Sequence, residues 1–321
     1  MAASHGAVDL AVAIPTLVGS LLSSIGTCFI LATYIFLPPK LSHVRHTLIR
    51  NLAVAEFGLH LGGSISGLTI LGLKRDLQDG PGCVASGFLT QLCVQAVDCN
   101  MLVISITLFF IITQRFDLVK PPRRITATLI VAPWILPTIT SFTALFKHFY
   151  HPVSGNWCWI QAEPKYLRYV LTHGWRFVFI IAILAMGLRI RLYVKRNRIK
   201  SQDGLELEGM YSEGKDQTSS GYTEHLLETQ DHDDAVTISE KSKTLLLLSG
   251  YPLFYVVLWL PGIANRVAEA TGHPIRALAI LQASTAYIGF ANAATFGWNE
   301  VRDQFSVHRM LELTLGFMLS D

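Results

Sequence analysis

The sequence is poor in charged residues. Only 15% of its 321 residues are Asp, Glu, Lys or Arg, whereas 51% are apolar. Soluble globular chains carry about 25% charged residues, so much of the surface is expected to face lipid rather than water. The net charge of +3 is small and gives no reason to expect binding to nucleic acid.

Processing and catalytic signatures are also missing from the sequence. Residues 1–9 hold no Lys or Arg, so we expect no cleavable signal peptide and interpret 1–9 as a short extracellular segment. The sequence has no His-x-x-x-His pair, no glycine-rich phosphate loop and no supported Ser/His/Asp set. We therefore expect a protein that is not an enzyme and that has neither a cofactor nor a metal.

Long apolar runs are what the chain does contain. A helix needs roughly 20 mostly apolar residues to cross a bilayer, and seven segments meet that requirement. They are Leu10–Phe36, Leu48–Leu73, Cys83–Thr113, Ile125–Phe146, Tyr166–Leu188, Thr244–Asn265 and Ala277–Trp298. The expected fold class is all-α, a seven-transmembrane helix bundle over residues 10–298.

Lys and Arg are divided unevenly between the two sides of this bundle. Most of the 26 lie in the loops 40–50, 115–124 and 189–243 and in the tail 299–321. Loops rich in Lys and Arg stay in the cytoplasm, so the amino terminus is expected outside the cell. The predicted location is the plasma membrane, with several passes.

Two polar segments lie on the expected cytoplasmic side. The third inner loop, residues 195–242, is long, and its middle from Asp203 to Glu240 is acidic and rich in Ser, Thr and Gly. Such a composition cannot bury enough apolar surface to fold, so we expect disorder there. The tail 299–321 alternates apolar and charged residues, which favours an amphipathic helix on the inner leaflet over a frayed tail.

Two cysteines fall on the outer side by this topology. Cys83 opens the third segment, and Cys158 lies in the second outer loop within Asn156–Ile160, which reads Asn-Trp-Cys-Trp-Ile. Because the extracellular side is oxidising, we expect the two to form a disulfide. Two free thiols are the alternative.

The pattern resembles G-protein-coupled receptors, and three stretches resemble the cyclic-AMP-receptor-like family of slime moulds and fungi. These are Asn156–Ile160, Tyr251–Arg266 and Trp298–Arg302. The resemblance implies a ligand-triggered receptor for an extracellular chemical signal. It also implies coupling to a heterotrimeric G protein, often in cyclic-AMP or nutrient signalling.

Other classes of protein fit less well. Residues 113–117 read Thr-Gln-Arg-Phe-Asp rather than Asp-Arg-Tyr, and residues 290–296 lack Asn-Pro-x-x-Tyr, which we interpret as setting the chain apart from ordinary rhodopsin-like receptors. A retinal protein needs an intramembrane Lys, and the seventh segment has none. A membrane transporter is the alternative function, although no internal repeat supports it. A metal-dependent hydrolase is disfavoured because His60 alone lies clearly inside a span.

Polar residues inside the membrane are candidates for a ligand site. Gln91, Gln95 and Asp98 are spaced by four and three, so they share one face of a helix. Arg176 in the fifth segment must face a cavity or a partner such as Asp98. A cavity lined by these four would suit a small polar or anionic ligand, with Arg176 as the counter-charge. Hydrogen bonding between helices is the alternative, and it is favoured most for Glu56 and His60 in the second segment.

The sixth segment and the inner loops are candidates for signal transfer. Pro252, Trp259 and Pro261 form the expected hinge of the sixth helix, with a static proline kink as the alternative. Basic residues on the inner side are the expected G-protein contacts. They are Arg115, Arg189, Arg191, Lys195, Arg196, Arg198, Lys200, Lys241 and Lys243. Membrane lipid and a small extracellular ligand are further expected partners, and a homodimer stays open.

Overall fold

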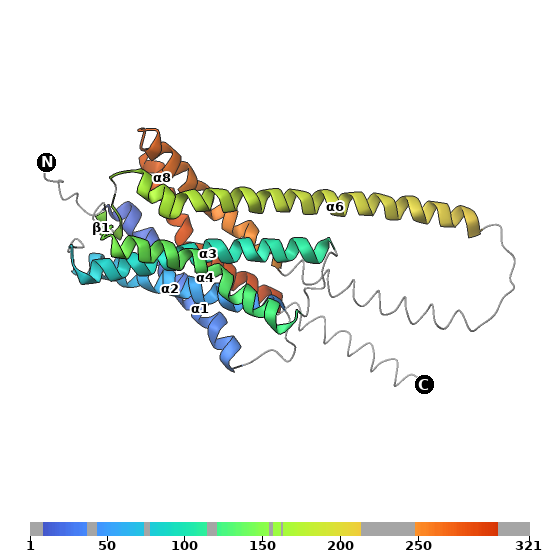
Figure 1. Cartoon of the computed structure of the whole chain (residues 1–321), viewed down its shortest axis with the longest axis horizontal. Helices are drawn as coiled ribbons and strands as arrows, with labels where there is room; N and C mark the ends of the chain where they lie inside the picture. Colours follow the sequence, from blue (N-terminus) through green and yellow to red (C-terminus); the bar gives the residue numbers. More distant parts are fainter. Residues whose placement is uncertain are drawn as a thin grey trace.

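The computed structural model describes residues 9–36, 44–73, 78–113, 121–153, 157–161, 163–212 and 248–300. It is a bundle of long helices with a short β-hairpin at one end (Figure 1). Its first half comprises α1 (Leu10–Phe36), α2 (Val44–Leu73), α3 (Pro81–Ile112), α4 (Arg123–Phe146), β1 (Tyr150–Val153) and β2 (Trp157–Ile160).

The second half begins with a single long rod. It is built from α5 (Tyr166–Arg168), the π-helical turn η1 (Tyr169–His173) and α6 (Gly174–Ser212). A helix over residues 248–270 follows. The last span consists of α8 (Arg276–Leu281), the 3-10 turn η2 (Gln282–Tyr287) and a helix over residues 288–300.

The seven-helix prediction is confirmed. Among the described residues, six helices are long and apolar enough to cross a membrane, namely Leu10–Phe36, Val44–Gly72, Pro81–Ile112, Arg123–Phe146, Tyr166–Arg196 and Arg276–Glu300. The helix over 248–270 is the remaining one. Its apolar residues are interrupted by Pro252, Pro261 and Asn265, which lowers its mean hydropathy.

One boundary differs strongly from the sequence prediction. The fifth span was expected to end at Leu188, but α6 continues to Ser212 and projects well past the other helices (Figure 1). For residues 203–212 the structure has helix where we expected disorder. Glu, Leu, Lys, Arg and Gln are good helix formers and no proline interrupts them, so the helix extends beyond its apolar portion. Residues 213–247 and the predicted amphipathic tail from residue 301 lie outside the described part of the chain.

Helix α3 lies at the centre of the bundle. It packs against α2, α4 and α6, and it is the most buried of the six spans. Large apolar side chains elsewhere point outward, among them Ile25 at 67%, Phe36 at 79% and Ile181 at 67% exposed. A seven-helix protein in a bilayer places such side chains against lipid tails.

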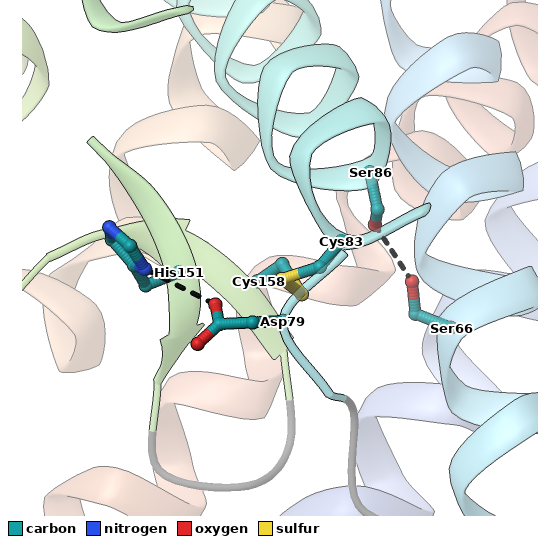
Figure 2. Close-up of a disulfide and its surroundings, with 6 residues drawn as sticks. All are labelled: Ser66, Asp79, Cys83, Ser86, His151 and Cys158. Carbon is teal, nitrogen blue, oxygen red and sulfur yellow. Dashed lines mark hydrogen bonds and ion pairs between the residues drawn. A yellow bond between two sulfur atoms is a disulfide. The ribbon is translucent and has the colours of Figure 1, made fainter. Parts of the chain in front are cut away.

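A two-stranded hairpin covers one end of α3. Strands β1 and β2 are antiparallel, with Tyr150 opposite Ile160 and Pro152 opposite Cys158. Cys158 forms the expected disulfide with Cys83 at the start of α3 (Figure 2). Burial raises the pKa of Tyr150, so its hydroxyl stays protonated and donates to Gln91 Oε1 at 2.7 Å. The outer end of the bundle is therefore closed by a covalent bond and a buried hydrogen bond.

Removing the disulfide should loosen this outer end. The Cys83–Cys158 bond closes a loop of 75 residues, and native disulfides typically stabilise by about 2–5 kcal/mol. We expect the double variant Cys83→Ser with Cys158→Ser to unfold at a lower temperature in detergent. Cys28→Ser, a free cysteine in α1, is the control and should unfold like the wild type. Equal loss of stability in both variants would contradict the prediction.

Candidate functional site

A buried ion pair joins three helices inside the bundle. Arg176 Nε of α6 donates to Asp98 Oδ2 of α3 at 2.9 Å. The Tyr255 hydroxyl, from the helix over 248–270, donates to Asp98 Oδ1 at 2.8 Å. Asp98 and Tyr255 are fully buried, and Arg176 is 5% exposed. A buried charge is costly unless it is paired and hydrogen-bonded, and here Asp98 and Arg176 provide each other with an opposite charge and a hydrogen bond.

The ion pair has an aromatic cover. Arg176 Cζ lies 3.7 Å from the centroid of the Trp259 ring, close enough for a cation–π interaction. Tyr255 and Trp259 are four residues apart and so share a face of their helix. The sequence analysis singled out Trp259 and missed Tyr255, although this spacing was the available signal.

A π-helical turn precedes Arg176 on the same rod. The Gly174 N–H bonds to the Tyr169 carbonyl, five residues earlier. A Cβ at position 174 would lie 2.6 Å from that carbonyl oxygen, so glycine alone fits without a shift. Trp175 Nε1 donates to the Val170 carbonyl at 2.9 Å and gives it a partner in the widened turn. The extra residue of such a turn rotates the preceding helix by about 100°, which changes the direction in which Arg168 points.

A cavity of about 1120 Å³ lies beside the ion pair. Arg176 and Trp259 line its wall, together with Arg168 and His173 from the segment before Arg176. Side chains of α1, α2 and α3, the hairpin, the helix over 248–270 and the last span contribute further lining. Ligand cavities for drug-sized molecules hold about 300–1,000 Å³, so this one is large enough for an organic molecule.

The four predicted ligand residues do not share one surface. Arg176 lines the cavity, whereas Gln91, Gln95 and Asp98 are fully buried outside its lining. Gln91 accepts from Tyr150 and Gln95 accepts from the Thr140 hydroxyl of α4. This placement fits the alternative of hydrogen bonding between helices. Ligand contact by Gln91, Gln95 or Asp98 remains a prediction.

A second polar cluster ties α2 to the last span. Asn292 Nδ2 donates to Glu56 Oε1, and both residues are buried. His60, one turn from Glu56, lines the cavity. A Cβ at position 289 would lie 2.8 Å from His60 Cδ2, so Gly289 lets the last span approach the imidazole closely. Interhelical hydrogen bonding is again what Glu56 contributes.

The residues predicted for signal transfer are only partly described. The helix over 248–270 continues through Pro252 and Pro261, and the hinge at Pro252, Trp259 and Pro261 stays a prediction. Four of the candidate G-protein contacts lie exposed on α6, namely Arg189, Arg191, Lys195 and Arg196. Arg198 and Lys200 are also on α6, without described side chains. Arg115, Lys241 and Lys243 lie outside the described residues.

These features define a seven-transmembrane receptor: seven helices, an outer hairpin held by a disulfide, and a cavity next to a buried charge pair. The chain belongs to the 7 transmembrane receptor (rhodopsin family), whose sequence profile matches residues 26–293. Our interpretation that the absent Asp-Arg-Tyr and Asn-Pro-x-x-Tyr motifs set the chain apart from rhodopsin-like receptors is therefore corrected. A family is recognised from the pattern of its whole membrane domain, and two short motifs do not decide it.

Two similar proteins agree with this assignment. The ascaroside receptor GPR2 of the fungus Arthrobotrys oligospora is 27% identical over 186 residues, which cover 56% of this chain and 44% of that protein. The similarity thus spans less than half the length of the relative. The crystal structure of squid rhodopsin superposes with a TM-score of 0.64 at 14% identity, over 89% of this chain and 75% of that one. It shows a shared fold.

Breaking the ion pair should destabilise the bundle. Asp98→Asn leaves the Arg176 charge buried without a carboxylate, a loss of about 3–5 kcal/mol, and we expect a sharp drop in thermal stability and surface expression. Tyr255→Phe removes one hydrogen bond to a charged group and should cost about 1.5–3 kcal/mol. Asp79→Asn, at an exposed outer carboxylate, is the matched control. The ion pair has no structural role if Asp98→Asn is as stable as that control.

The π-turn should depend on glycine at its end. Gly174→Ala places a methyl group against the Tyr169 carbonyl, so we expect lower thermal stability and a changed position of Arg168. Gly187→Ala on the same α6 meets nothing within 4 Å and should stabilise the helix by about 0.5–1 kcal/mol. Thermal unfolding in detergent compares the two. A shift of the same sign and size in both variants would show that the turn tolerates a side chain.

Proposed function

We propose that the chain is a receptor that transmits an extracellular small-molecule signal to a heterotrimeric G protein from the plasma membrane. The family supports ligand and G-protein partners. The fungal relative, named an ascaroside receptor, supports a small organic ligand. The resemblance of Asn156–Ile160, Tyr251–Arg266 and Trp298–Arg302 to the cyclic-AMP-receptor-like family favours cyclic-AMP or nutrient signalling.

The observation that carries this proposal is the shared wall between cavity and ion pair. Arg176 and Trp259 line the cavity, and the same two side chains connect α6 to α3 and to the helix over 248–270. A ligand that contacts Arg176 or Trp259 more favourably in one arrangement of these helices shifts the population toward that arrangement. The two helices continue toward the inner side, where the G protein binds.

The inner loop between these helices is suited to two tasks. Its basic ends, with Lys195 and Arg196 exposed on α6, also face the anionic inner leaflet, where each charge contributes about 1 kcal/mol of attraction. The acidic middle carries hydroxyl groups that could be phosphorylated, each adding about −1.5 to −2 charges. These are Ser212, Thr218, Ser219, Ser220, Thr223 and Thr237. We propose that the ends contact the G protein and that the middle regulates the contact.

Nucleotide exchange tests the proposal. Cells expressing the chain are screened with small organic compounds, with cellular cyclic AMP as the readout, and an active compound is then added to purified receptor and G protein. Lys195→Gln with Arg196→Gln should lower the exchange rate about fivefold, from the loss of two exposed ion pairs of about 0.5 kcal/mol each. Deleting 213–238 should keep the ligand response and prolong signalling.

Lys147→Gln on the outer side is the control for that experiment and should leave exchange unchanged. Loss of the ligand response in the deletion, with normal surface expression, would mean that the middle of the loop takes part in coupling. Ligand-dependent solute flux in liposomes without nucleotide exchange would favour a transporter and overturn the proposal.

A further inference from the structure

Several residues that line the cavity carry a buried hydrogen-bonding atom without a partner among the described residues. These atoms are Nη2 of Arg176, Nη2 of Arg168, Nε1 of Trp259, Nε2 of His173 and Nε2 of His60. Arginine and tryptophan nitrogens can only donate, so three of the five are donors. Buried donors without a partner are costly, and native proteins keep few of them.

The carboxylates that line the same cavity are already held. Glu269 accepts from Arg266 Nη1 at 2.7 Å and from Asn265 Nδ2 at 2.9 Å. Asp79 pairs with His151 at 3.2 Å, and Asp9 pairs with Arg276 at 3.5 Å. The carboxylate oxygens of the wall are therefore already paired, whereas several of its side-chain nitrogens have no partner.

Arg168 brings to this wall a positive charge without a close ion-pair partner among the described residues, while Glu269 and Glu163 act on it from a longer distance. Its Nε donates to the backbone carbonyls of Ile160 and Gln161, at 2.9 and 3.2 Å. Within the described part of the chain no carboxylate lies within ion-pair distance of Arg168, whereas Arg176 has Asp98. The charges of Arg168, Arg176 and Arg266 all act on His173, which stacks at 6.4 Å on Trp159. Arg168 lies directly before the π-turn and His173 at its end, and both line the cavity together with Arg176.

The part of the wall that α1 and α2 form carries no arginine. It presents the apolar side chains Val12, Ala13, Leu17, Leu59 and Ile70, interspersed with the polar side chains Thr16, Ser20, Ser66 and His60. At about 1120 Å³ the cavity is far larger than a compact ion needs. The two parts of the wall together favour a molecule with one acidic end and an apolar body.

We infer that the cavity binds an organic carboxylate, whose acid group is held by Arg168, Trp259 and the free Nη2 of Arg176, and whose apolar body lies against α1 and α2. This deepens the proposed function, since it takes the cavity as the ligand site. Arg168 is the residue that confers selectivity for the acid. Arg176 serves as a donor whose own charge is balanced by Asp98.

The test measures thermal unfolding of the purified full chain in detergent, without a G protein. The probes are hexanoic, octanoic, benzoic and phenylacetic acids, each beside its methyl ester, with acetate to test the apolar body. At least one acid should raise the unfolding temperature, while its ester and acetate should have little effect. Arg168→Gln should weaken the response to that acid about tenfold or more, because hydrogen bonds to charged groups are the strong ones.

Matched variants separate this site from general effects. Trp259→Phe keeps the ring and loses the donor, so it should weaken the acid several-fold. Lys147→Gln removes a cation from the outer side away from the cavity and should respond like the wild type. If Arg168→Gln folds poorly, Arg168→Lys keeps the charge without the forked donors and should give an intermediate affinity.

The inference is overturned if no acid stabilises the protein, if esters act as well as acids, or if Arg168→Gln responds like Lys147→Gln. Acid binding without nucleotide exchange would instead count against G-protein coupling and leave the carboxylate site intact. Signalling in response to a compound without an acid group, together with no acid binding, would do the reverse.

Discussion

The buried contact between Asp98 and Arg176 is the interaction on which the polar interior depends. Neither charge could remain ionised inside a membrane bundle without a close partner, and at 2.9 Å each is the other's partner. The Tyr255 hydroxyl donates a hydrogen bond to the second oxygen of the Asp98 carboxylate, and the Trp259 ring lies against the Arg176 guanidinium. Three helices therefore meet at one point, and a change in the position of any of them alters the free energy of the contact.

The two sides of α3 differ in how firmly they are held. Toward α4 and the hairpin, Gln91 and Gln95 accept buried hydrogen bonds, and the Cys83–Cys158 disulfide joins the hairpin to the helix. Toward α6 the packing includes a π-turn and a large cavity. A ligand-driven rearrangement of α6 requires such a difference. The contacts of α3 with α4 and the hairpin then preserve the bundle while the ligand changes the packing between α3 and α6.

Much of the architecture could be predicted from the sequence because a bilayer imposes strict demands. A helix in lipid must satisfy its own backbone and be apolar for about 20 residues, so α1 was predicted to the residue. The oxidising side and the position of Cys83 and Cys158 indicated the disulfide. The need of a buried charge for a partner suggested Asp98 for Arg176, as the structure confirms.

The sequence alone thus predicted the spans and the disulfide and indicated Asp98 as one possible partner of Arg176, because local composition and the chemistry of buried charges permit few alternatives. Which surface each polar residue meets was decided by packing. Helical spacing placed Gln91, Gln95 and Asp98 on one face, but that this face packs on α4 and α6 rather than lining a cavity depends on neighbours distant in the chain. Arg168 was not predicted as a site residue, because the direction of its side chain depends on a π-turn that no local sequence pattern predicts. The cavity is lined by six of the helices and by the hairpin, so only their assembled packing could place it.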